Sequence, residues 1–174
     1  MTADEKRAKL AQLAKIVTAA AAERRAILAE SGPAAERAAE LLRVIGGYQF
    51  PDGTTIYQAS TVEAAYDKHG YALESVGVIL IEDRQGQRSA RLASKTYIFF
   101  DVNTITKRVL AGTAWADPWQ KKDYVALLLD LKGSRRYQRT VLNRKRVWGI
   151  EVPLEVWRAA VIPAAAPPEA PAPA

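Results

Sequence analysis

The chain has 174 residues and a formal net charge of +6, and 49% of its residues are hydrophobic, 25% charged and 8% aromatic. These values are typical of a globular protein with one principal domain, and roughly 150 ordered residues bury about two thirds of the surface that they expose when unfolded. Cysteine is absent, which excludes disulfides, thiolate catalysis and zinc–sulfur sites and leaves the cytoplasm as the simplest expected location.

The first 46 residues predict a helical hairpin. A capping-box pattern, Thr2 with Glu5, opens the first helix, and apolar side chains then recur at helical spacing, at Leu10, Leu13, Val17, Ala20 and Ile27. A break at residues 31–33 separates this helix from a second one, which ends at the glycine pair 46–47. Charged residues interrupt the alanine-rich part of the first helix, so we expect neither a signal peptide nor a membrane span.

The apolar stripe of this predicted hairpin is mostly alanine. Small side chains allow helices to approach closely but bury little area each, so a pair of such helices is marginally stable alone. We therefore expect residues 1–46 to dock on the main body or to pair with a second copy as a coiled coil, which would make the protein a homo-oligomer. The alternative is a solvated helical arm.

Residues 47–116 predict an α/β core with antiparallel strands. The β-prone runs 48–50 and 54–58 surround a Pro–Asp–Gly turn, and Ser60 with Glu63 then opens a short helix that Gly70 can end. The run 76–81 and the run 94–102 predict two paired strands. Because both runs are apolar on both faces, we expect helices to cover each side of the sheet. The residues from 103 to 116 favour no particular element.

Residues 117–162 predict a basic helical region packed on that core. Asp117 followed by Pro118 is a strong helix start, because Asp accepts hydrogen bonds from free amides and proline suits the first turn. The buried stripe of this helix is then supplied by Trp119, Tyr124, Leu127, Leu128 and Leu131. A short strand at 150–153 and a last helix up to Val161 follow, and the Ala- and Pro-rich residues 163–174 predict a disordered tail.

The stretch from Gly133 to Gly149 carries the whole charge excess of the chain. It contains six cations and no acidic residue: Arg135, Arg136, Arg139, Arg144, Lys145 and Arg146. Without these six, 19 basic residues remain against 19 acidic ones. A local field of this kind, with no counterion inside the stretch, points to an anionic partner.

Two conformations are open for this basic stretch. Ser134 as an N-cap and Gly149 as a stop favour a helix, which would form a helix-turn-helix-like pair with the helix before it. In that helix three side chains face inward, Tyr137, Val141 and Trp148, and the arginines at 135, 136, 139 and 146 face outward. The short linker and the many good strand formers indicate a strand instead, namely Tyr137, Thr140, Val141, Val147 and Trp148. We favour the helix, and either conformation displays the cations.

Together these elements predict an α+β fold. It consists of an N-terminal helical hairpin, a small and mostly antiparallel sheet, a C-terminal helical pair with a basic second element, and a disordered tail. No membrane partner is expected.

The function that the sequence favours is nucleic-acid binding, to DNA or RNA. The residues expected to make the contacts are Arg135, Arg136, Tyr137, Arg139, Arg144, Lys145 and Arg146. One alternative is a structural or assembly protein that binds an acidic protein surface through the same stretch, and a third is a metal-independent ribonuclease whose cations stabilise the transition state.

No catalytic residue, metal site or cofactor is predicted from the sequence. The carboxylates that could hold magnesium match no metal motif in their spacing, at Asp101, Asp117, Asp123 and Asp130. The chain has one histidine, His69, near a predicted helix end, where a structural role is expected. No glycine-rich loop follows a predicted strand, so nucleotide binding by a phosphate loop has no support.

Overall fold

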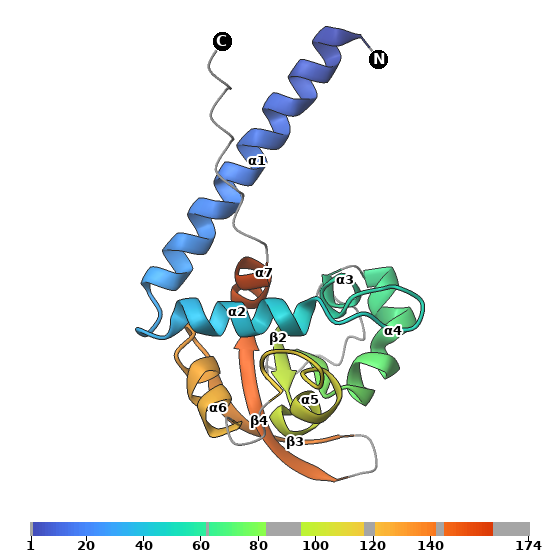
Figure 1. Cartoon of the computed structure of the whole chain (residues 1–174), viewed down its shortest axis with the longest axis vertical. Coiled ribbons are helices and arrows are strands. Elements are labelled where there is room, and N and C mark those ends of the chain that lie inside the picture. The colour runs from blue at the N-terminus through green and yellow to red at the C-terminus, as the bar shows by residue number, and fades with distance from the viewer. Residues whose placement is uncertain (1, 62, 83–94, 117–120, 142–144, 162–174) are drawn as a thin grey trace.

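The computed structural model of the chain describes residues 2–61, 63–82, 95–116, 121–141 and 145–161. Within these ranges it contains seven helices and one four-stranded antiparallel sheet with the strand order β1-β2-β4-β3 (Figure 1). The predicted α+β class is therefore confirmed. The helices are α1 (Ala3–Ala29), α2 (Ala35–Gly46), α3 (Ile56–Thr61), α4 (Glu63–Ser75), α5 (Val102–Arg108), α6 (Lys121–Leu129) and α7 (Leu154–Val161), and the strands are β1 (Val78–Glu82), β2 (Lys95–Phe100), β3 (Arg135–Thr140) and β4 (Arg146–Pro153).

The two predicted N-terminal helices are present, but they do not pack against each other as a hairpin. The capping box that opens α1 is formed, with the amide of Glu5 donating to Thr2 Oγ1 at 3.2 Å. Figure 1 shows α1 projecting from the body while α2 lies across it. None of the helices in the described ranges is long and apolar enough to cross a membrane.

The bend between α1 and α2 is held against the end of α6. The amide of Gly32 donates to the carbonyl of Asp130 at 2.7 Å, and the amide of Ala34 donates to Asp130 Oδ2 at 2.9 Å. A Cβ atom at Gly32 would lie 2.5 Å from the Asp130 carboxyl group, so a larger residue would have to displace the carboxylate that accepts from Ala34. The base of α1 is thus fixed close to the start of β3.

The hydrophobic core lies between α2, α7 and one face of the sheet. α2 is amphipathic and buries Leu41, Leu42 and Ile45, which recur at helical spacing. Trp157 of α7 is fully buried, and its indole Nε1 donates to Ser60 Oγ at 2.9 Å, so its polar group is satisfied inside the core.

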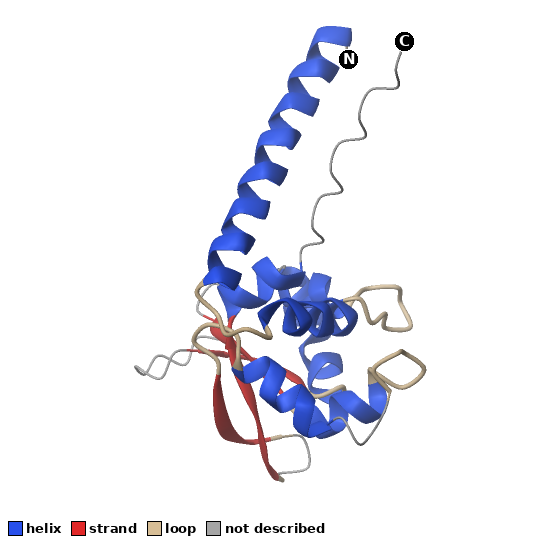
Figure 2. Cartoon of the chain, turned by 60° about the vertical axis from the view of Figure 1, so that its left-hand side comes forward, coloured by secondary structure: helices blue, strands red, loops and turns tan. Residues whose placement is uncertain are grey.

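The two apolar runs form β1 and β2, which pair antiparallel with Leu80 opposite Ile98, as predicted. Their core-facing side chains, Leu80 and Ile98 among them, pack under the helices. The expectation of helices on both sides of the sheet is wrong for the described residues, because the helices gather on one side (Figure 2). The opposite face still buries Phe99 completely, which explains why the strand is apolar on both faces.

Between α2 and β1 the structure is more helical than predicted. The runs around the Pro–Asp–Gly turn form a single bridge, Gln49 with Thr55, instead of a hairpin. Thr55 and Gln58 form a capping box that starts α3, since each backbone amide donates to the other side chain. α4 continues past Gly70 to Ser75, because tertiary packing outweighs the roughly 1 kcal/mol cost of a helical glycine.

The predicted helix before the basic stretch is α6, and its buried side chains include Tyr124, Leu127 and Leu128. The predicted start of this helix, at residues 117–119, lies outside the described residues, as does the predicted tail. The last predicted helix is α7, which follows β4 directly.

The helix favoured for the basic stretch is wrong, because this stretch forms the hairpin of β3 and β4. Its strand formers prevail because β4 lies inside the sheet, paired with both β2 and β3. Gly149 does not stop a helix but lies in the middle of β4. A Cβ atom there would come within 2.3 Å of the Phe100 carbonyl oxygen and 2.4 Å of the Phe99 ring, so glycine allows the two strands to pack.

Candidate nucleic-acid interface

The β conformation divides the predicted binding residues between two faces of the sheet. Side chains alternate along a strand, so Arg135, Tyr137 and Arg139 share the face opposite the helices. Arg136 and Arg146 point to the helix side. Lys145 directly precedes β4, and Arg144 lies outside the described residues.

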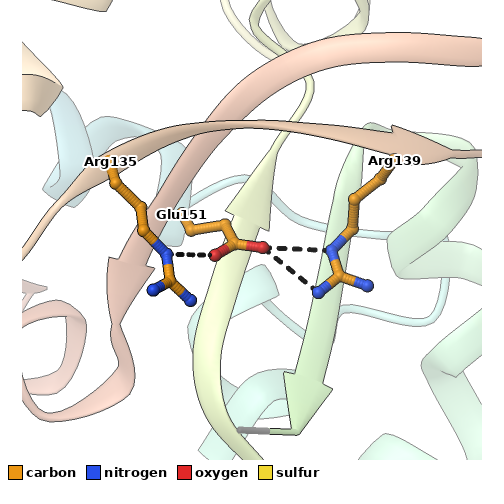
Figure 3. Close-up of polar contacts among 3 residues, drawn as sticks. All are labelled: Arg135, Arg139 and Glu151. Atoms are coloured by element: carbon orange, nitrogen blue, oxygen red, sulfur yellow. Dashed lines mark hydrogen bonds and ion pairs between the residues drawn. The ribbon is translucent and has the colours of Figure 1, made fainter. Parts of the chain in front are cut away.

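The face opposite the helices holds an ion-pair cluster around Glu151 (Figure 3). Arg135 Nε donates to Glu151 Oε2 at 2.7 Å, and Arg139 donates to Oε1 from Nε at 3.2 Å and from Nη2 at 3.1 Å. Glu151 is fully buried. The expectation that the six cations lack a local counterion is therefore wrong for these two, because antiparallel pairing brings Glu151 of β4 opposite Arg135.

Aromatic rings also hold these arginines. The guanidinium carbon of Arg135 lies 4.4 Å from the centroid of the Tyr97 ring, and that of Arg139 lies 5.1 Å from the Tyr137 centroid. Cation–π contacts of this kind and a shared carboxylate fix the two side chains along the sheet. Arg135, Arg139 and Tyr137 therefore belong to a structural cluster on this face.

The helix side of the hairpin forms a groove with α5 and α6. Its first part has a volume of about 370 Å³ and is lined by Arg136, Lys145, Arg146 and Trp148 of the hairpin, by Val102 and Asn103 of α5, and by Val125 of α6. A second part of about 290 Å³ reaches Lys107 and Thr104 of α5. The two parts are adjacent, since both are lined by Asn103, Lys145 and Val147.

The groove is strongly cationic. Arg136, Lys145, Arg146 and Lys107 are exposed along it. In the part of the chain that the structure describes, no acidic side chain forms an ion pair with Arg136, Lys145 or Arg146. The carboxylate of Asp101 also lines the second part, but it is buried and accepts from Thr104 Oγ1 at 2.7 Å as the cap of α5.

Trp148 is the residue whose side chain the sequence prediction oriented wrongly. The helical interpretation turned this side chain inward, whereas 67% of it is exposed on the groove side of β4. It lies opposite Gln138, with Arg146 two residues before it on the same face and Arg136 diagonally across on β3. Arg146 and Trp148 are two residues apart, and in a strand this spacing predicts that their side chains lie on the same face.

The acidic residues and the histidine singled out in the sequence have other roles. Asp101 caps α5, and Asp130 holds the bend between α1 and α2. His69 stacks on Phe50 and lies 3.2 Å from Asp52, outside the groove lining. Among the described residues, no group of three or more His, Cys, Asp or Glu side chains is placed to hold a metal ion.

The hairpin thus presents two unlike faces. The face opposite the helices holds the ion-pair cluster around Glu151. The helix side holds a cationic groove with the exposed indole of Trp148. Comparison of this chain with protein-family models, with curated proteins and with solved structures finds no match.

Proposed function

We propose that this protein binds nucleic acid through the groove side of the β3–β4 hairpin. The observation that carries the proposal is the exposed Trp148 among Arg136, Lys145 and Arg146, none of which has an acidic partner among the described residues. Unpaired cations on a shared surface attract phosphates through counterion release, and an aromatic ring among them offers a stacking surface for bases.

The two faces of the hairpin have different parts in this proposal. Arg136, Lys145 and Arg146 contact phosphates, and Arg144, which the sequence places between the two strands, stays in the predicted contact set. Arg135 and Arg139 share the carboxylate of Glu151, so their part is to fix the twist and position of the hairpin. Preorganised cations lose less side-chain entropy when they bind a phosphate.

The same cations would attract an acidic protein, but an exposed indole suits a planar base better than an aspartate or glutamate side chain. The test below must therefore distinguish binding of nucleic acid from binding of an acidic protein. The described lining around Trp148 holds cations but no carboxylate or imidazole to accept a proton, and the Asp101 carboxylate in the second part of the groove is buried as the cap of α5, so the ribonuclease alternative has less support.

The test is a charge reversal with a matched control. Replacing Arg136, Lys145 and Arg146 with Glu should weaken binding to a labelled oligonucleotide by about 100-fold or more at a salt concentration near 100 mM, because three phosphate contacts become repulsions. The control replaces three exposed cations outside the hairpin and the groove lining with Glu, namely Arg25, Lys68 and Arg158. It has the same net charge change and should alter affinity by less than about 3-fold.

Two results would overturn this proposal. Equal losses in both variants would show attraction to overall charge without a site. Unchanged binding in the hairpin variant would move the contact elsewhere. Competition by heparin at equal concentration shows whether the groove distinguishes nucleic acid from other polyanions.

We also infer that α1 mediates self-association. Its apolar side chains Leu10, Leu13, Ile16 and Val17 are between 45% and 66% exposed, on a helix that projects from the body (Figure 1). Leu10, Leu13 and Val17 follow the spacing of heptad positions a and d, which pair helices by mutual burial. The partner proposed is α1 of a second copy.

A further inference from the structure

Trp148 is exposed where a large aromatic side chain is usually covered. Among the described residues outside α1, Tyr71 and Trp148 are the exposed large hydrophobic side chains. Trp157, by contrast, is fully buried in the core. Tyr71 lies on α4, whereas Trp148 lines the groove, so the exposed indole coincides with the cationic surface.

The groove around Trp148 has apolar walls and cationic ends. Val102 of α5, Val125 of α6 and Ile150 of β4 line the same cavity as the indole. Its volume of about 370 Å³ lies near the lower end of the roughly 300 to 1,000 Å³ typical of small-ligand sites. A site of this size has room for one planar group, and the adjacent second part is lined by Thr104 and Lys107 of α5.

We propose that Trp148 stacks on one unpaired base of a single-stranded nucleic acid, whose phosphates lie along Arg136, Arg146 and Lys145. This inference rests on the proposed nucleic-acid binding and adds the class of strand. In a duplex both faces of each base are covered by neighbouring pairs, and only the edges are open in the grooves. The indole is 67% exposed on the groove side, so its ring is open to any base whose own face is free. A single strand can offer its bases without first unstacking a duplex.

The base is held by stacking, and no sequence preference is built into this contact. Every base has a π-face, so stacking on tryptophan tolerates any sequence. The cations on either side of the indole follow the backbone to each side of the stacked nucleotide. The predicted ligand is therefore a single strand of any sequence, bound more tightly than a duplex of the same length.

The experiment compares a labelled oligothymidylate of about 15 nucleotides with a duplex of equal length, by fluorescence anisotropy. The variants are Trp148→Ala, Trp148→Phe and the exposed-aromatic control Tyr71→Ala. Trp148→Ala should weaken single-strand binding by about 5-fold to 100-fold, the range for losing one stacked base, and should change duplex binding less. Trp148→Phe should restore most of the loss, and Tyr71→Ala should match the wild type.

A second readout is the tryptophan emission. Saturating oligothymidylate should quench part of the emission of the wild type, and this quenching should vanish in Trp148→Phe while that variant still binds. If the wild type binds strand and duplex equally and Trp148→Ala binds as the wild type does, the stacking inference is wrong while nucleic-acid binding stands. If the wild type binds neither ligand, the proposed function itself is wrong.

Discussion

At the residue scale, the buried carboxylate of Glu151 links the two strands of the hairpin through ion pairs. It joins Arg135 and Arg139 across the two strands, and its side chain is fully buried while theirs are partly exposed. Removing one partner of a buried ion pair is costly, because the charges left behind stay partly desolvated.

We therefore expect Glu151→Ala to lower the free energy of unfolding by about 2 to 3 kcal/mol, below the full buried-pair value because both arginines reach solvent. For a chain of this size that corresponds to a fall in Tm of roughly 5 to 10 °C. Glu151→Gln keeps the volume and one acceptor and should lose less. The control Glu155→Ala, on the exposed side of α7, should change Tm by no more than about 2 °C. A Glu151→Ala protein as stable as the wild type would show that the cluster does not stabilise the hairpin.

The sequence did not predict which side chains of the basic stretch contact one another or which face of the sheet each one occupies. Arg135 and Glu151 are 16 residues apart, and only the strand pairing brings them together. The sequence showed six cations without an acid between them, which is true along the chain but not in space. Trp148 was misplaced because helical and strand periodicities assign the same residue to different faces.

At the scale of the elements, the sequence predicted helices and strands correctly where the chain has capping residues or long apolar runs. The capping box of α1 and the apolar runs of β1 and β2 are where the sequence indicates them. The basic stretch has no such signal, since its residues suit both conformations, and pairing with β2 decided the outcome. A helical arm was the alternative expectation for this region, but the direction of α1 could not be predicted, because it depends on the bend at Gly32 and its contacts with Asp130.

The α1 inference predicts that the chain associates in solution and that its apolar face is the cause. Replacing Leu10, Leu13 and Val17 with Gln should shift the mass measured by light scattering to that of a monomer, 19.1 kDa, while circular dichroism shows a folded chain, because these side chains lie outside the core of each copy. A matched control replaces Gln12 and Lys15 of the same helix with Ala and should keep the mass of the wild type. A wild-type chain that is monomeric at high concentration would rule out this role for α1.

At the scale of the whole molecule, the base of α1 lies close to the start of the β3–β4 hairpin. Asp130 holds the bend after α1, and β3 begins a few residues later. Because α1 projects away from the body, pairing through α1 would leave the groove of each copy open to ligand (Figure 1). Two linked sites gain affinity from effective concentration when the ligand can span them. The net charge and the α+β class followed from the sequence, whereas this arrangement is a property of the folded chain.

The central claim is that the cations on the groove side contact phosphates and those around Glu151 do not. The measurement is the slope of the logarithm of affinity against the logarithm of salt concentration, between about 50 and 200 mM, for the wild type, Arg136→Gln and Arg135→Gln. Each variant loses one positive charge, and circular dichroism checks that each is folded. Arg136→Gln should flatten the slope by about 0.7 to 0.9, the value for one phosphate contact, and Arg135→Gln should leave it unchanged. Equal flattening in both variants, or none in Arg136→Gln, would contradict the account.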